Sequence, residues 1–216
     1  MAEIKYCGLT RAVDAEHAVA LGATYVGVIF AGGPRLLSVL RAAEVLSPAP
    51  ASVHRVGVFG DQPVEEIAEI ATRLSLSAAQ LHGRVDAARL ERLRALFDGE
   101  LWLVHRVREP NLSPDTSALA LPADGVLLDA YVPGVLGGSG RTFDWDQLAP
   151  RLDTIRHEKR LILAGGLRPE NVAAAIAAIH PDVVDVSSGV ESAPGIKDHD
   201  RMTAFRDAVL ETSLST

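Results

Sequence analysis

The sequence Leu163-Ala164-Gly165-Gly166-Leu167-Arg168-Pro169-Glu170-Asn171-Val172 is followed closely by Asp185-Val186-Ser187-Ser188-Gly189-Val190-Glu191. In each stretch an apolar run ends in glycine or serine, and a helix is predicted to begin there. Such a junction presents free backbone N–H groups at the positive end of a helix, where a phosphate group binds well. Two of them in succession, late in a chain of alternating strands and helices, are typical of the phosphate site of a (β/α)8 barrel. The sequence therefore predicts a small phosphorylated substrate, with its phosphate group on the backbone around Gly165, Gly166, Ser187, Ser188 and Gly189, although either stretch could also be an ordinary turn.

Strand-like and helix-like segments alternate from one end of the chain to the other. Apolar runs predict strands over residues 4–7, 25–30, 53–59, 78–82, 101–107, 125–129, 161–164 and 183–187. Helical patterns predict helices over residues 13–21, 39–46, 64–74, 87–97, 113–121, 146–152, 170–179 and 200–210, of which 113–121 has the weakest pattern. Even spacing of these units favours an α/β fold of the closed (β/α)8, or TIM, barrel type, and an open doubly wound sheet is the main alternative. No linker interrupts the pattern, so residues 1–216 are expected to form a single barrel domain.

Composition narrows the class of protein. The chain has 216 residues, of which 48% are hydrophobic, and a net charge of −7. The negative charge argues against general binding to nucleic acid or to an anionic membrane, so local donors must hold an anionic substrate. A single cysteine, Cys7, excludes an intramolecular disulfide and makes a cysteine-based zinc site improbable. We find no signal-peptide pattern and no apolar run long enough to span a membrane, so we expect a cytoplasmic protein.

The predicted strand ends carry few groups that can do chemistry. In a barrel, residues at the C-terminal ends of the strands point toward the substrate, and here they include Cys7, His82 and Asp129. A glycine-rich segment, residues 130–143, follows the sixth predicted strand on the same face, where such loops often act as substrate lids. The remaining histidines show no metal-ligand spacing, and we expect no metal.

Cys7 could be a small buried apolar residue, or it could be a nucleophile or general base. An ordinary thiol, with a pKa of about 8.5, is only a few per cent thiolate at neutral pH, so a basic role requires a site that stabilises the thiolate. Alternation along the strand places Lys5 on the same face, one layer below Cys7. A buried lysine needs an acidic partner, and we expect that partner to be Asp185 on the last strand.

Three further residues have both a functional and a structural interpretation. Asp129 closes an apolar strand, so it could cap a turn, or burial could raise its pKa and make it a general acid. Arg35 lies in the loop after the second strand and is either solvated or a bidentate partner for a carboxylate. His82 could donate to the substrate or simply close a loop.

The motifs together resemble one family, the phosphoribosylanthranilate isomerases, from end to end of the chain. The resemblance is carried by Lys5-Tyr6-Cys7-Gly8-Leu9-Thr10, Gly27-Val28-Ile29-Phe30 with Pro34-Arg35, Val56-Gly57-Val58-Phe59, Gln80-Leu81-His82-Gly83, Leu127-Leu128-Asp129-Ala130, Gly137-Gly138-Ser139-Gly140, and the two stretches quoted first. Each motif alone is weak, and their joint order and spacing are specific. The chain departs from the family's usual pattern at Gly33, His105 and Ser139, and these departures leave the acid and base in place.

The resemblance implies a (β/α)8 barrel that needs no metal or organic cofactor. It implies the Amadori rearrangement of N-(5-phosphoribosyl)anthranilate to 1-(2-carboxyphenylamino)-1-deoxyribulose 5-phosphate, in tryptophan biosynthesis. Cys7 matches the family's general base, Asp129 its general acid, and Arg35 the residue that holds the anthranilate carboxylate. His82 and Asp185 are further candidates for contacts with the substrate. The expected partner is a small phosphorylated molecule, and the chain could be a monomer or a homodimer.

Other functions remain open at this point. A related barrel enzyme could act on the Amadori substrate of histidine biosynthesis or on both substrates, but we find no second glycine-rich phosphate turn after the fourth strand. A metal-dependent pentose-phosphate epimerase would need paired His and Asp ligands at strand ends. A barrel that binds phosphate without catalysis would have no need for Cys7 and Asp129 together.

Overall fold

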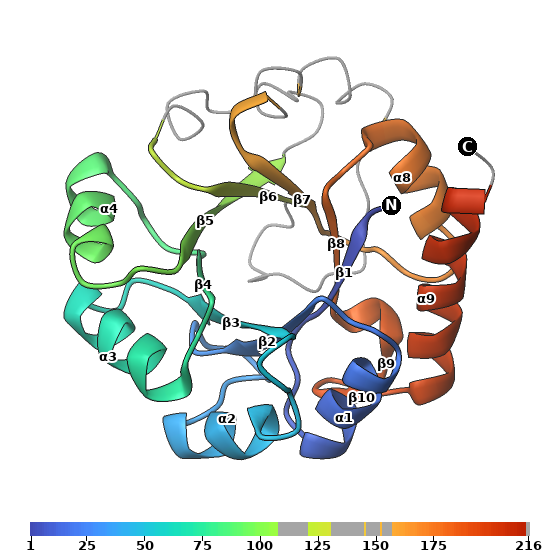
Figure 1. Ribbon diagram of the computed structural model, residues 1–216, viewed down its shortest axis with the longest axis horizontal. Coiled ribbons are helices and arrows are strands. Elements are labelled where there is room, and N and C mark those ends of the chain that lie inside the picture. Colours follow the sequence, from blue (N-terminus) through green and yellow to red (C-terminus); the bar gives the residue numbers. More distant parts are fainter. Residues whose placement is uncertain (108–120, 131–144, 146–151, 153–156, 215–216) are drawn as a thin grey trace.

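The computed structural model describes residues 1–107, 121–130, 145, 152 and 157–214. Its central element is a closed barrel of parallel strands (Figure 1). The strands are β1 (Glu3–Tyr6), β2 (Tyr25–Ile29), β3 (His54–Phe59), β4 (Ala78–Leu81), β5 (Glu100–Val107), β6 (Gly125–Ala130), β7 (Arg160–Leu163) and β8 (Val183–Val186). Each strand pairs with its sequence neighbours, and β1 pairs with β8 from Glu3↔Val183 to Tyr6↔Val186. This last pairing confirms the predicted barrel and rules out the open sheet.

The described helices lie on the outer face of the barrel (Figure 1). They are α1 (Ala12–Ala20), α2 (Val39–Leu46), α3 (Val64–Leu74), α4 (Ala87–Arg94), α8 (Val172–Ile179) and α9 (His199–Leu214). α3 illustrates why they form, because it begins after Pro63 and buries residues three and four positions apart, such as Val64, Ile67 and Ala71. Among the described residues, no helix is both long and apolar enough to cross a membrane.

The apolar core has two parts. The larger part lies mainly between the sheet and the helices, and a smaller cluster includes Tyr25, Val56, Trp102 and Ile162 from four different strands. This second cluster fits the packed interior of a barrel of this size, in which layers of side chains fill the space inside the strands. The strands are therefore held rigidly, and the side chains at their C-terminal ends are fixed in relation to one another.

The observed boundaries differ from the predicted ones mainly by a residue or two. Cys7, His82 and Ser187 were predicted to end strands, and each instead lies one residue beyond the strand. α4 ends at Arg94, earlier than predicted, and α9 covers residues 199–214, more than predicted. The predicted helices 113–121 and 146–152 and the glycine-rich segment 130–143 lie almost wholly outside the described residues, so these predictions are not tested.

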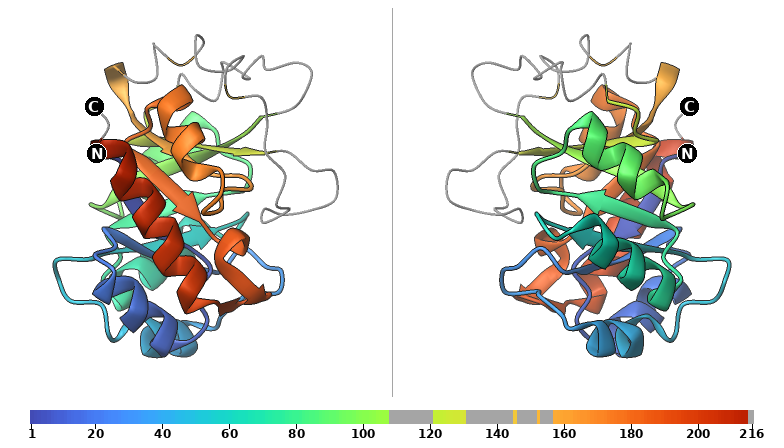
Figure 2. Two further views of the ribbon diagram at one scale, coloured as in Figure 1. Left: turned by 90° about the vertical axis from the view of Figure 1, so that its right-hand side faces the viewer. Right: turned by 90° about the vertical axis from the view of Figure 1, so that its left-hand side faces the viewer.

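A short hairpin after β8 was not predicted. Ser187 leads into a single turn of 3₁₀ helix, Ser188–Val190, and not into an α-helix as expected. Strands β9 (Glu191–Ala193) and β10 (Ile196–Lys197) then pair antiparallel before α9 begins. Figure 2 shows this hairpin at the opposite end of the barrel from the N-terminus and the end of α9. The hairpin therefore lies on the same face as the C-terminal ends of the strands.

Candidate active site

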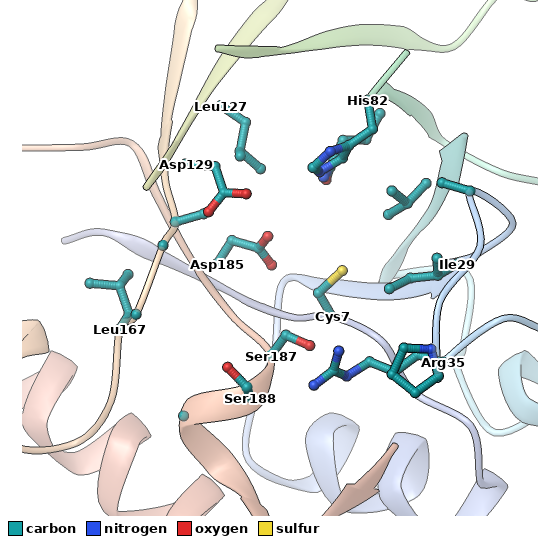
Figure 3. A pocket seen from close by; sticks show the side chains of 18 of the residues that line it. Cys7, Ile29, Arg35, His82, Leu127, Asp129, Leu167, Asp185, Ser187 and Ser188 are labelled. Atoms are coloured by element: carbon teal, nitrogen blue, oxygen red, sulfur yellow. The ribbon is translucent and has the colours of Figure 1, made fainter. Parts of the chain in front are cut away.

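Every candidate site residue from the sequence lines one pocket at the C-terminal ends of the strands. The lining includes Cys7, Arg35, His82, Asp129, Gly165, Gly166, Asp185, Ser187, Ser188 and Gly189. Figure 3 shows the side chains of Cys7, His82, Asp129 and Asp185 around the same cavity, and Arg35 beside Ser187 at its edge. The structure thus brings together residues that lie far apart in the sequence, and their chemical roles remain predictions.

Cys7 directly follows β1 and is only 5% exposed. Its backbone N–H donates to the carbonyl of Val186 at 2.9 Å, which fixes the residue to the end of β8. The facing position on β2 is Gly27, where a Cβ atom would lie 3.1 Å from Cys7 Sγ and 3.3 Å from Lys5 Nζ. The absence of a side chain at Gly27 therefore leaves the thiol and the ammonium side by side.

Lys5 is fully buried and meets the predicted partner. Its Nζ donates to Asp185 Oδ1 at 3.0 Å and to Gln80 Oε1 at 3.1 Å, so the expected Lys5–Asp185 pair is confirmed. Burial by itself would lower the pKa of Lys5, but Asp185 and Cys7 outweigh it and raise the pKa. The ammonium group therefore stays charged inside the barrel.

The charged groups around Cys7 act on its pKa in opposite directions. Burial raises the pKa of the Cys7 thiol most, and the negative charge of Asp185 raises it further. The positive charges of Lys5 and Lys197 act in the opposite direction and lower this pKa. The net pKa is above the ordinary value, because desolvation of the thiolate is the largest effect. Two nearby cations thus partly offset a burial that would otherwise disfavour the thiolate.

Asp129 is the next-to-last residue of β6 and pairs in register with Arg106 of β5. It is 7% exposed. Its carboxylate points into the cavity (Figure 3). A carboxyl group in such a position can transfer a proton to or from a bound molecule.

Arg35 does not project into the pocket as an unpaired cation. Its Nε and Nη2 donate to the two carboxylate oxygens of Glu191 at 2.7 and 2.6 Å, a bidentate ion pair. The hydrogen bond with Glu191 raises the pKa of Arg35. Gly8, with φ +68°, allows this packing, because a Cβ there would lie 2.5 Å from Arg35 Cδ. Glu191 therefore fixes one edge of the guanidinium, and a substrate carboxylate would have to bind the remaining edge.

His82 is a neutral imidazole at physiological pH. Burial lowers the pKa of His82 to about 4, and the positive charges of Arg106 and Lys5 add to the effect. Its Nδ1 is buried without a hydrogen-bond partner among the described residues. A hydroxyl group of a bound molecule can satisfy such a nitrogen.

The two predicted phosphate turns lie next to each other. Gly165 and Gly166 both have positive φ, +81° and +71°, a conformation that favours glycine. At Gly189 a Cβ would lie 1.9 Å from the carbonyl oxygen of Leu167, so the second turn packs directly on the chain that follows the first. Asn171 stabilises the first turn, because its Nδ2 donates to the Gly166 carbonyl at 3.0 Å and its Oδ1 accepts from the Arg168 N–H at 2.9 Å.

Three residues at the site were missed by the sequence prediction: Asn171, Glu191 and Lys197. Lys197 is buried and donates to the backbone carbonyl of Cys7, and Glu191 accepts hydrogen bonds from both Lys197 and Arg35. One signal was available, since Pro194-Gly195 is a common turn pair and predicts a hairpin there. In the described part of the chain, no group of three His, Cys, Asp or Glu side chains could hold a metal ion.

Comparison with known proteins gives one consistent result. The family model of N-(5'-phosphoribosyl)anthranilate isomerase matches residues 4–208. An enzyme of that name from Acidithiobacillus ferrooxidans is 42% identical over 206 residues, which are 95% of this chain and 96% of the relative. The crystal structure of phosphoribosyl anthranilate isomerase from Thermotoga maritima is 35% identical, covers 98% of this chain and 100% of its own, and superposes with a TM-score of 0.86. A phosphoribosyl anthranilate isomerase in complex with reduced 1-(o-carboxyphenylamino)-1-deoxyribulose 5-phosphate is 33% identical with the same coverage and a TM-score of 0.82.

Proposed function

The chain belongs to the N-(5'-phosphoribosyl)anthranilate isomerase family, the isomerases of tryptophan biosynthesis, and we propose that Cys7 and Asp129 are the base and the acid of its reaction. The reaction is the Amadori rearrangement of N-(5-phosphoribosyl)anthranilate to 1-(2-carboxyphenylamino)-1-deoxyribulose 5-phosphate. It opens the ribose ring and moves one proton away from the second carbon of the sugar.

Asp129 starts the reaction as a general acid. Its proton passes to the ring oxygen as the bond between that oxygen and the first carbon breaks, and the anthranilate nitrogen becomes an iminium. The iminium makes the proton on the second carbon acidic. The thiolate of Cys7 removes that proton, and the electron pair forms a double bond between the first and second carbons. The resulting enolamine tautomerises to the ketone, and proton exchange with solvent restores the acid and the thiolate.

The substrate's two anionic groups would be held at different parts of the pocket. The phosphate would accept hydrogen bonds from the backbone of the turns at Gly165–Gly166 and 187–189, a position that (β/α)8 enzymes commonly use for phosphate. The carboxylate of anthranilate would bind the edge of Arg35 that Glu191 leaves open. His82 and Asp185 would contact the sugar hydroxyl groups. Fixing both ends of the substrate places its first two carbons between the acid and the base.

One observation carries the proposal most directly. Cys7, directly after β1, and Asp129, in β6, line the same cavity, and residues of both turns and Arg35 also line it. The relative whose complex contains a reduced form of the product supports the same class of ligand for this pocket.

Turnover measurements test the assignment of acid and base. The phosphoribosyl adduct of anthranilate can be followed by fluorescence. We expect Cys7→Ala and Asp129→Asn each to lower kcat by about 10²- to 10⁴-fold, because each removes a proton-transfer group, while product binding changes little. Asp124→Asn is a matched control, since Asp124 bonds Leu101 N–H and Arg94 at the opposite end of the barrel. Near-normal kcat in Cys7→Ala or Asp129→Asn would refute the role of that residue, and turnover of the histidine-pathway Amadori substrate would show the broader specificity.

A further inference from the structure

Two of the chain's three lysines are buried close to Cys7. The lysines are Lys5, Lys159 and Lys197, and only Lys159 lies at the other end of the barrel, before β7. Lys197 is 3% exposed, on the hairpin strand β10. It is not part of the pocket lining, so any effect that it has on the reaction must pass through other residues.

The ammonium group of Lys197 is fully used in contacts with the site. Its Nζ donates to the carbonyl of Cys7 at 2.6 Å, to the carbonyl of Ser187 at 3.0 Å and to Glu191 Oε1 at 2.9 Å. An ammonium has three donors, so these three acceptors satisfy it. One cation thus joins the backbone of the proposed base to the backbone at the start of the second phosphate turn.

Glu191 extends this connection to Arg35. Its Oε1 accepts from both Lys197 Nζ and Arg35 Nε, and its Oε2 accepts from Arg35 Nη2. The side chains of Lys197, Glu191 and Arg35 are 0%, 4% and 11% exposed, so the triad is screened little by solvent. Burial lowers the pKa of Lys197, and Glu191 acts against this effect. The Glu191 carboxylate thus joins Lys197 to Arg35, beside the position proposed for the anthranilate carboxylate.

The hairpin that carries Lys197 is itself held in place. Lys197 N–H donates to Asp14 Oδ2 at 3.3 Å, and the Lys197 carbonyl accepts from Arg11 Nη2 at 3.1 Å. Asp14 is a buried residue of α1 and pairs with Arg11 and His199. The ammonium group is therefore presented from a fixed backbone and not from a mobile surface strand.

We propose that Lys197, acting with Glu191, is a positioning residue for the isomerase reaction: it fixes the base Cys7 and the turn at Ser187 directly, and the carboxylate anchor Arg35 through Glu191. The inference rests on the proposed function. Because the substrate must reach the base, the phosphate turn and Arg35 at once, an error in their spacing affects both binding and proton transfer.

Kinetics of Lys197→Met provide the test. We expect kcat to fall and KM to rise, with kcat/KM lower by about 10- to 100-fold. Glu191→Gln should mainly raise KM, because it loosens Arg35 and leaves Lys197 on the two carbonyls. The control is Lys159→Met, since Lys159 also donates to main-chain carbonyls, those of Leu121 and Ala123, but away from the pocket. It should keep the kcat and KM of the unmodified protein.

A double-mutant cycle separates positioning from a general loss of stability. If Lys197 acts on Arg35 through Glu191, Arg35→Ala should raise KM much less in the Lys197→Met background than in the unmodified protein, because the anchor is already displaced. Additive effects, or unchanged kcat and KM in Lys197→Met, would overturn the inference.

If Lys197→Met does not fold, the pair Lys197→Gln with Glu191→Gln, which removes both charges together, is used in the same cycle. Activity of Cys7→Ala would refute the proposed function instead, so the two failures are distinguishable.

Discussion

At the scale of single residues, buried groups define the chemistry of the pocket. Lys5 and Asp185 form the pair that strand alternation predicts, and Cys7 lies above them at the end of β1. His82 differs from these groups because it is partly buried, and both burial and the positive charges of Arg106 and Lys5 lower its pKa. A buried group that resists protonation makes stability depend on pH.

Because of His82, we expect the free energy of unfolding to decrease in mild acid. Its folded pKa of about 4 lies below the value of about 6.5 for an unfolded histidine. As pH falls through this window, the unfolded chain binds a proton at His82 that the folded chain does not, so the free energy of unfolding falls. The free energy of unfolding of the unmodified protein should fall between about pH 7 and about pH 5. In His82→Gln we expect this fall to be smaller by on the order of 1–2 kcal/mol.

Urea unfolding at the two pH values measures this effect. His157→Gln is the control, because His157 is exposed. If His82→Gln has the same pH dependence as the unmodified protein, the histidine is not the buried neutral group described above.

The residues at strand ends could be predicted from the sequence, and their pairing could not. Cys7, His82 and Asp129 follow apolar runs, so the barrel pattern points to them directly. Glu191 is also visible in the sequence, but its bond to Arg35 depends on where the β9–β10 hairpin lies. Since that contact joins residues 156 positions apart, no local pattern contains it.

At the scale of elements, the turns after β7 and β8 act as one unit. Gly189 packs against the Leu167 carbonyl, and Asn171 ties the Gly165–Gly166 turn to the start of α8. The sequence predicted both turns from their glycines and serines. The predicted helix after β7 begins at residue 170, whereas α8 begins at Val172. The difference arises because the side chain of Asn171 forms hydrogen bonds that close the preceding turn.

Substitution of Gly189 tests whether contact between the turns matters for phosphate. We expect Gly189→Ala to weaken competitive inhibition by inorganic phosphate by about 10-fold or more, because the new Cβ pushes the turns apart.

Gly22→Ala is the matched control. Gly22 also cannot accept a side chain without strain, since its φ is +79°, but nothing lies within 4 Å of its Cβ position. It should cost about 1 kcal/mol of stability and leave inhibition unchanged. Equal inhibition constants in the two variants would contradict the assignment of these turns to phosphate.

At the scale of the whole molecule, closure of the barrel brings residues from the first strand and from the last strand and hairpin together at the site. Lys5 lies in β1 and Cys7 directly after it, Asp185 lies in β8 and Lys197 in β10, and β1 and β8 are the pair that closes the barrel. Sequence periodicity predicts the strands and helices, but closure depends on the register between β1 and β8. Even spacing of the units favoured closure and left the open sheet as an alternative, the family resemblance then implied closure, and the observed Lys5–Asp185 pair agrees with it.

The thiolate of Cys7 depends on this closed arrangement. The charged groups that bear on it include, within the described residues, Lys5 of β1, Lys197 of β10, Asp185 of β8 and Arg35 in the loop after β2. Because Cys7 is the only cysteine in the chain, alkylation by iodoacetamide reports on this thiol alone. Its rate rises with pH as the thiolate forms.

The central claim, that the Cys7 thiolate is the base, is tested most directly by comparing two pH profiles of the same protein. We expect the pKa from the alkylation rate to equal the pKa of the rising limb of kcat/KM. In Lys5→Met both should shift to higher pH together, because the cation that lowers the pKa of Cys7 is gone. A kcat/KM profile that stays in place while the alkylation profile moves would contradict the claim, since another group would then be removing the proton.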